Sequence, residues 1–175
     1  MIDLPKLTLV LGGAASGKSK YAETLCLQCG LPRTYIATSR VWDSETKAKV
    51  AQHRTQRGPD WTTIEEPIDL PTRLRDLTKN TVVLLDCATL WLTNILLAEL
   101  DIEQHTADLR AALMQTQARV VVVSNEVGYG IVPENALSRR FRNAQGTLNQ
   151  ELAQDAASVV AVMAGLPLAL KGQLP

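Results

Sequence analysis

The sequence is poor in aromatic residues and carries no excess charge of either sign. It contains three Trp, three Tyr and one Phe among 175 residues, so its core must consist mainly of aliphatic side chains, as in a parallel sheet covered by helices. Its 18 Lys and Arg residues balance 18 Asp and Glu residues. Sequence-independent binding of nucleic acid or of a membrane surface requires a basic patch, so we expect small-molecule partners and no nucleic acid.

Long apolar runs and a cysteine framework are also missing. No apolar run approaches the roughly 18 residues of a membrane-spanning helix, and Met1–Pro5 lacks the basic flank of a signal peptide. We therefore expect a cytoplasmic protein without stable membrane insertion. The three cysteines fit a reducing compartment. Cys26 and Cys29 form a C-x-x-C pair at the end of a predicted helix, without a second pair at zinc spacing, which favours packing over metal or redox chemistry.

The sequence does contain a phosphate-binding motif in its usual structural setting. Leu7–Leu11 is a short apolar run typical of a buried strand, and helical spacing of apolar residues follows Lys18. The residues between fill every position of G-x-x-x-x-G-K-S/T: Gly12, Gly13, Ala14, Ala15, Ser16, Gly17, Lys18 and Ser19. In such a loop backbone N–H groups bind phosphate, Lys18 reaches the β- and γ-phosphates, and Ser19 ligates Mg²⁺. The alternative is a glycine-rich turn that matches by chance.

The remaining apolar runs predict an α/β fold. Strands are predicted at Arg33–Ala37, Thr81–Asp86, Arg119–Ser124 and Ser158–Ala164, with a short edge strand at Leu168–Lys171. Helices are predicted at Ser44–Arg57, Asp69–Leu77, Cys87–Leu100 and Leu109–Gln117, and along an apolar stripe from Leu137 to Leu152. This alternation predicts one domain over residues 1–175, a P-loop NTPase-type sheet of about five largely parallel strands with helices on both faces.

Polar residues end several of these strands. In open α/β sheets ligands bind beyond the carboxyl ends of the strands, so the nucleotide site should include Gly12–Ser19, Thr38, Asp86 and Asn125-Glu126. Asp86 closes an apolar strand as a Walker-B carboxylate does, which makes it a Mg²⁺ ligand in this interpretation and a helix cap in the alternative one. Thr38 is either a ligand contact or a turn hydroxyl.

Two further segments leave alternatives open. Lys49, His53 and Arg57 recur every four residues and share one face of the predicted helix. That face is either a solvated basic surface or a cationic surface turned toward triphosphate, with His53 as its reactive member. His105 lies in a polar stretch and should be exposed. Val127–Asn135 contains two glycines and one proline and is either a substrate-binding loop or a plain connection.

Taken together, these motifs resemble those of a known family, the bifunctional adenosylcobinamide kinase/adenosylcobinamide-phosphate guanylyltransferases of cobalamin biosynthesis. The P-loop alone is shared with many NTPases, whereas the later blocks in this order are specific to the family. The matching segments are Gly12–Ser19, Tyr35–Thr38, the Val50-x-x-His53-x-x-x-Arg57 spacing before Trp61, Asp86–Asn94, Ser124–Asn135 and Arg140–Gln150. One departure is Ala15, where the family often has Arg.

The resemblance implies two reactions on one scaffold. The first phosphorylates the aminopropanol hydroxyl of adenosylcobinamide with ATP or GTP, and the second transfers GMP from GTP to adenosylcobinamide phosphate. It implies that His53 is the guanylylated residue, with Lys18 as the other catalytic group. It also implies nucleotide contacts at Ile36, Ala37, Thr38, Arg54, Thr55, Gln56, Arg57, Glu65 and Asp86, and Mg²⁺ at Ser19 and Asp86. A homo-oligomer, specifically a trimer, is implied as well.

Two other classes of function stay open on the residues alone. A kinase of some other small metabolite would use the same P-loop and Asp86 but would need no reactive His53. A nucleotide-dependent switch would also use the P-loop, yet it would hydrolyse GTP slowly and transfer nothing. Covalent labelling of the protein by GTP separates both from the bifunctional enzyme.

Overall fold

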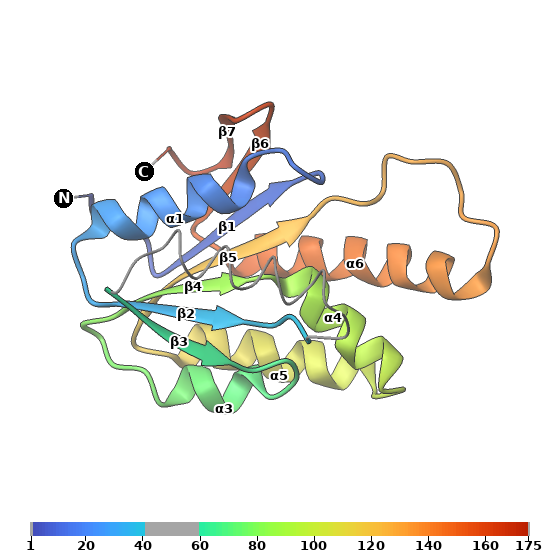
Figure 1. The fold of residues 1–175 in the computed structure, drawn as a ribbon, viewed down its shortest axis with the longest axis horizontal. Helices are drawn as coiled ribbons and strands as arrows, with labels where there is room; N and C mark the ends of the chain where they lie inside the picture. Colours follow the sequence, from blue (N-terminus) through green and yellow to red (C-terminus); the bar gives the residue numbers. More distant parts are fainter. Residues whose placement is uncertain (1, 41–59, 175) are drawn as a thin grey trace.

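The computed structural model describes residues 2–40 and 60–174, which form one seven-stranded sheet in the order β3-β2-β4-β5-β1-β6-β7 (Figure 1). The strands are β1 (Leu7–Gly12), β2 (Arg33–Ala37), β3 (Trp61–Glu65), β4 (Val82–Asp86), β5 (Arg119–Asn125), β6 (Ser158–Met163) and β7 (Leu166–Lys171). Neighbouring strands are parallel throughout, except that β7 pairs antiparallel with β6. All strands but β7 therefore present their carboxyl ends at one edge of the sheet.

Helices cover both faces of this sheet, and each face has its own apolar core. The described helices are α1 (Lys18–Cys29), α3 (Leu70–Arg75), α4 (Ala88–Leu97), α5 (Ile102–Gln115) and α6 (Ala136–Asp155). One core lies between the sheet and α1, and the other lies between the sheet and the remaining four helices. Successive residues of β5 point into alternate cores: Val121 belongs to the first and Val122 to the second. Burial on both sides explains why the central strands are continuous Val and Leu runs. The predicted α/β fold, largely parallel with helices on both faces, is confirmed.

Three details differ from the sequence-based predictions. β3 was not predicted, because Trp61–Glu65 shows neither a continuous apolar run nor strict alternation; it lies at the edge of the sheet, where no continuous apolar run is needed. Helix α5 starts seven residues before the predicted Leu109, capped by Asp101, whose side chain accepts from the Gln104 N–H. Leu137, placed in the apolar stripe of α6, is 52% exposed, since the first turns of α6 extend past the sheet (Figure 1).

The predicted helix Ser44–Arg57 lies outside the described residues. Within the described part of the chain, no helix is long and apolar enough to cross a membrane.

Candidate nucleotide-binding site

The P-loop lies between β1 and α1, as the motif predicts. β1 ends at Gly12 and α1 begins at Lys18, and the turn between them uses positive φ at Ala15 (55°) and Gly17 (94°). The Lys18 side chain is buried, and its Nζ donates to the Gly13 carbonyl over 3.0 Å. An ammonium group has three N–H donors, so Lys18 can hold its place in the loop and still donate to phosphate oxygens.

Two glycines of the loop are required by close contacts. A Cβ on Gly12 would lie 2.4 Å from Ser16 Oγ and 2.7 Å from the Val162 carbonyl oxygen. A Cβ on Gly17 would lie 3.1 Å from Gly165 Cα. The tip of the β6–β7 hairpin therefore packs directly against the phosphate-binding loop, which fixes the loop from a segment almost 150 residues away in the sequence.

The register of the sheet brings the predicted edge residues together. Gly12 pairs with Asn125 of β5, and Asp86 of β4 pairs with Ala37 of β2 on one side and Val123 of β5 on the other. The Glu126 N–H donates to the Gly12 carbonyl over 3.0 Å. The P-loop, Ala37, Asp86 and Asn125 thus share the carboxyl edge.

Ser19 and Asp86, the predicted Mg²⁺ ligands, lie in the first turn of α1 and at the end of β4. The Asp86 carboxylate is part-buried and accepts from the Tyr35 hydroxyl over 3.3 Å, while Ser19 is part-exposed in the first turn of α1. In the described part of the chain no three His, Cys, Asp or Glu side chains gather as a metal cluster. Mg²⁺ in nucleotide sites takes only one or two protein ligands besides water and phosphates, so this donor set fits Mg²⁺.

Thr38 is buried and ties β2 to β4. Its Oγ1 accepts from the Cys87 N–H and donates to the Cys87 carbonyl, both over 2.8 Å, and its own carbonyl accepts from Asn94 Nδ2 over 2.7 Å. The hydroxyl thus has a structural role between two strand ends rather than within a local turn. The nucleotide contact predicted for Thr38 stays a prediction, as do those of Ile36 and Ala37, which are also buried.

A buried polar network that the sequence did not reveal supports the end of β5. Gln145 Nε2 donates to Ser124 Oγ and to Asn149 Oδ1, each over 2.9 Å, and Ser124 Oγ donates to Asn149 Oδ1 over 2.6 Å. The Asn125 backbone continues the network, because its N–H donates to Thr89 Oγ1 and its carbonyl accepts from Asn149 Nδ2. Strand β4 pairs with β5 only as far as Val123. On the β4 side of Ser124 and Asn125, these side-chain hydrogen bonds take the place of strand pairing.

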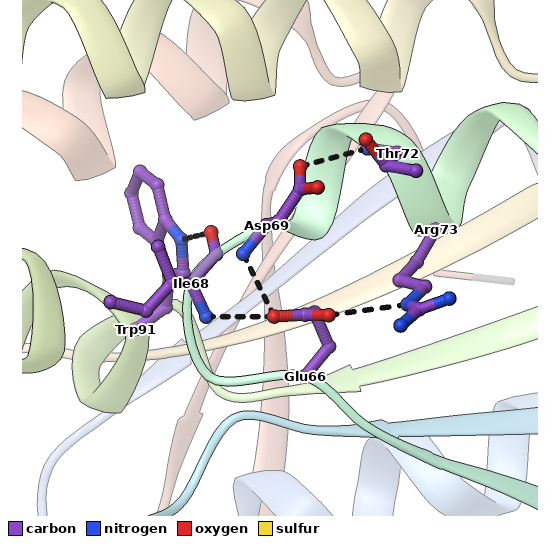
Figure 2. Close-up of polar contacts among 6 residues, drawn as sticks. All are labelled: Glu66, Ile68, Asp69, Thr72, Arg73 and Trp91. Atoms are coloured by element: carbon purple, nitrogen blue, oxygen red, sulfur yellow. Dashed lines mark hydrogen bonds and ion pairs between the residues drawn. The ribbon is translucent and has the colours of Figure 1, made fainter.

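Glu66 organises the turn after β3. Figure 2 shows the Glu66 carboxylate accepting from the backbone N–H groups of Ile68 and Asp69 and facing Arg73 of α3. The Ile68 carbonyl in turn accepts from Trp91 Nε1 of α4 over 2.8 Å. Glu65 is exposed at the end of β3, so its side chain is free of this turn and its predicted nucleotide contact stays a prediction.

The predicted residues His53, Arg54, Thr55, Gln56 and Arg57 lie outside the described residues. The other histidine, His105, lies in α5 with its Nδ1 2.7 Å from the Asp101 carbonyl. It is part-exposed, roughly as expected, and its helix begins at Ile102. Cys26, Cys29 and Cys87 are buried free thiols, and burial raises the pKa of Cys26 and that of Cys87, the latter to about 11. Cys26 and Cys29 are both buried where α1 packs on its sheet face, which fits the packing role predicted for the C-x-x-C pair.

An open groove between α5 and α6 has a volume of about 980 Å³. Its lining comes from the α4–α5 connection, α5 and α6, and includes Glu103, Arg110 and Asn143. None of the predicted nucleotide-binding residues lines it. The P-loop backbone and the edge residues stay the candidate nucleotide site, because loops of this type bind phosphate by N–H groups and charge and need no enclosed cavity.

Two solved structures share the fold of this chain. One from Pyrococcus horikoshii OT3 aligns with a TM-score of 0.54 at 12% identity, covering 99% of this chain and 89% of that chain. An ATPase from the type III secretion system of pathogenic bacteria also aligns with a TM-score of 0.54, at 11% identity, covering 95% of this chain and 57% of that chain. The fold and the loop together are those of a P-loop nucleotide-binding protein.

The chain belongs to the cobinamide kinase / cobinamide phosphate guanyltransferase family, whose profile matches residues 8–170. CobP of Pseudomonas aeruginosa is 43% identical over 170 residues, covering 94% of this chain and 97% of its own. CobU of Escherichia coli K12 is 39% identical over 181 residues, covering 94% of this chain and 99% of its own. Both are described as bifunctional adenosylcobalamin biosynthesis proteins. The chain is therefore a bifunctional transferase, and the resemblance noted from its motifs is confirmed.

Proposed function

We propose that this enzyme phosphorylates the aminopropanol hydroxyl of adenosylcobinamide with ATP or GTP, and then transfers GMP from GTP to the resulting phosphate to give adenosylcobinamide-GDP. The observation that carries the proposal is the P-loop, with Lys18 buried in it, at the same sheet edge as Asp86. We assign both reactions to one domain spanning residues 1–175, acting in the cytoplasm.

In the kinase step the chain positions the reactants and neutralises charge. The substrate hydroxyl attacks the γ-phosphorus, a new O–P bond forms, and the bond to the nucleoside diphosphate breaks as the hydroxyl proton leaves. N–H groups of Gly13–Ser19 would bind the phosphates, and Lys18 would offset charge that develops on the transferring group. Ser19 and Asp86 would hold Mg²⁺, which supplies charge neutralisation on the phosphates.

In the guanylyl step His53 would be the nucleophile. A neutral imidazole nitrogen attacks the α-phosphorus of GTP, forming an N–P bond while pyrophosphate leaves. A phosphate oxygen of adenosylcobinamide phosphate then attacks the same phosphorus and the N–P bond breaks, which frees His53. Arg54 and Arg57 would offset charge on the α-phosphate, and Ile36–Thr38, Thr55, Gln56 and Glu65 would complete the nucleotide contacts. A homotrimer is the oligomer that we propose.

Separate measurement of the two products tests this proposal. The enzyme is incubated with adenosylcobinamide, Mg²⁺ and γ-labelled GTP or ATP, and the labelled corrinoid phosphate and the GDP derivative are resolved by chromatography. We expect the phosphate to appear first and the GDP product to follow only when GTP is present. Phosphorylation without any GDP product would leave a single-function kinase, and GTP hydrolysis without either product would leave a nucleotide-dependent switch.

A further inference from the structure

The connection between β5 and α6 exposes large apolar side chains. Tyr129 is 94% exposed, Ile131 95% and Val132 61%, and with Leu137 in the first turn of α6 they form what we call the apolar loop patch. In Figure 1 this connection arches away from the carboxyl end of β5 before α6 begins. Exposed loop tips are normally small and polar, so a loop that presents four large apolar residues indicates a binding surface.

Hydrogen bonds fix this loop at both ends. At its start, Glu126 Oε1 accepts from the Gly128 N–H over 2.6 Å. At its end, Arg139 Nη1 donates to the carbonyls of Pro133 and Glu134, and Asn135 Oδ1 accepts from the Ser138 N–H over 2.7 Å. Fixing the two ends of the loop reduces the conformational entropy that it must lose when a ligand binds.

The loop also begins beside the phosphate-binding site. The last residue of β5, Asn125, pairs with Gly12 of the P-loop, and the next N–H, that of Glu126, donates to the Gly12 carbonyl. The connection that carries the loop patch therefore starts at the same edge of the sheet as the P-loop. Leu166, Leu168 and Leu170 are exposed along the edge strand β7 and form a separate apolar surface for contact with a second copy of the chain.

We propose that the apolar loop patch binds the corrin macrocycle of the acceptor substrate and so presents its aminopropanol arm to the P-loop. This inference rests on the proposed function. The patch offers mainly apolar contact, since Glu134 is the one charged residue of the connection Val127–Asn135, and this suits the broad face of a macrocycle. A nucleotide needs donors to its phosphates instead, and the P-loop already supplies these.

The test is a double variant, Tyr129→Ser with Ile131→Ser, which changes side chains too exposed to affect folding. We expect the KM for adenosylcobinamide in the kinase assay to rise about tenfold or more, with the KM for GTP unchanged. Labelling of the protein by α-labelled GTP without any corrinoid should also stay unchanged. Tyr129→Phe should behave as wild type, because the ring contact remains. Leu27→Ser with Met114→Ser, two side chains that are 46% and 50% exposed on other helices, is the matched control.

Three outcomes overturn the inference. In the first, the KM of the double variant for adenosylcobinamide stays within twofold of wild type. In the second, this KM rises equally in the control variant. In the third, it rises only together with a change of oligomeric state in sedimentation, which would assign the patch to a contact between copies of the chain. A wild-type enzyme that does not phosphorylate adenosylcobinamide would instead refute the proposed function. In that case equilibrium dialysis with adenosylcobinamide tests corrinoid binding at the patch independently of turnover. Equal affinity of the wild type and the double variant for adenosylcobinamide would overturn the inference.

Discussion

The backbone N–H of Gly165 donates a hydrogen bond of 2.8 Å to the carbonyl of Ser16, which joins the tip of the β6–β7 hairpin to the middle of the P-loop. Both central residues of that hairpin turn, Ala164 and Gly165, have positive φ, as the two-residue turns between antiparallel strands require. The turn therefore has the geometry that brings its backbone against Gly17. The last hairpin of the chain is part of the support of the nucleotide site.

Gly17→Ala tests this support. The new Cβ would meet the Gly165 backbone at 3.1 Å, at a residue whose φ is 94°, so we expect a loss of about 1–3 kcal/mol in the free energy of unfolding and weaker GTP binding. Gly13→Ala is the control for stability, because no atom lies within 4 Å of its Cβ position. Urea unfolding of both variants measures the difference. Equal stability of the two variants would show that the hairpin does not constrain the loop.

Asn149→Ala should destabilise the carboxyl end of β5. It removes the acceptor of the Ser124 hydroxyl and of one Gln145 N–H, and the side-chain donor to the Asn125 carbonyl. Ser124 Oγ still accepts from Gln145, and the buried groups left unpaired should cost about 1–3 kcal/mol. The neighbouring Gln150→Ala removes only one exposed bond to the Gly146 carbonyl and should change stability by less than about 0.5 kcal/mol. Denaturant unfolding measures both, and a small effect at Asn149 would contradict the network.

We expect the buried Cys87 thiol to make the protein less stable in alkaline solution. Burial raises its pKa from 9.0 to about 11, so the folded protein retains a proton that the unfolded chain releases between these values. The contribution of the protonated Cys87 thiol to the free energy of unfolding is fully present below about pH 9. It is lost as the pH rises through about 11. Cys87→Ser keeps an acceptor for the Leu90 N–H but does not ionise, so its stability should fall less over this range, by roughly 1–3 kcal/mol. Parallel slopes for both proteins, in urea unfolding at pH 8 to 11, would contradict the assignment.

Lys18→Ala should reduce both transfer reactions by about a hundredfold or more, because its ammonium is the charge that the P-loop brings to the phosphates. The fold should persist, since the side chain's one hydrogen bond within the described residues is to Gly13. Lys20→Ala, an exposed residue of the same helix, is the control. Steady-state rates of both steps and the melting temperature measure the effects. Turnover of the Lys18 variant within a few-fold of wild type would place the nucleotide site elsewhere.

Much of the fold follows from the sequence because its central strands are buried on both faces. Burial makes Val82–Asp86 and Arg119–Asn125 almost continuous apolar runs, which are easily recognised. The edge strand β3 and the exposed start of α5 carry polar residues on their solvent sides, so pattern alone did not distinguish them from loops.

Some residues of the candidate site could likewise be recognised from the sequence, and others only from the fold. The P-loop and Asp86 were found because their chemistry depends on residue type and spacing along the chain. Gln145 and Asn149 look like an ordinary polar face of α6, and only the fold shows that this face is turned toward Ser124 and Asn125. Gly165 gave no signal either, because its role is a backbone contact with Ser16.

The most direct test of the proposed function is covalent labelling at His53. The protein is incubated with α-labelled GTP and Mg²⁺, denatured, and examined for label that is lost in acid and kept in base, as a phosphoramidate requires. Wild type and His105→Asn should carry this label. His53→Asn should carry none and make no adenosylcobinamide-GDP, while still phosphorylating adenosylcobinamide through the P-loop. A His53→Asn variant that is labelled as strongly as wild type, or that makes the GDP product at the wild-type rate, would contradict the account.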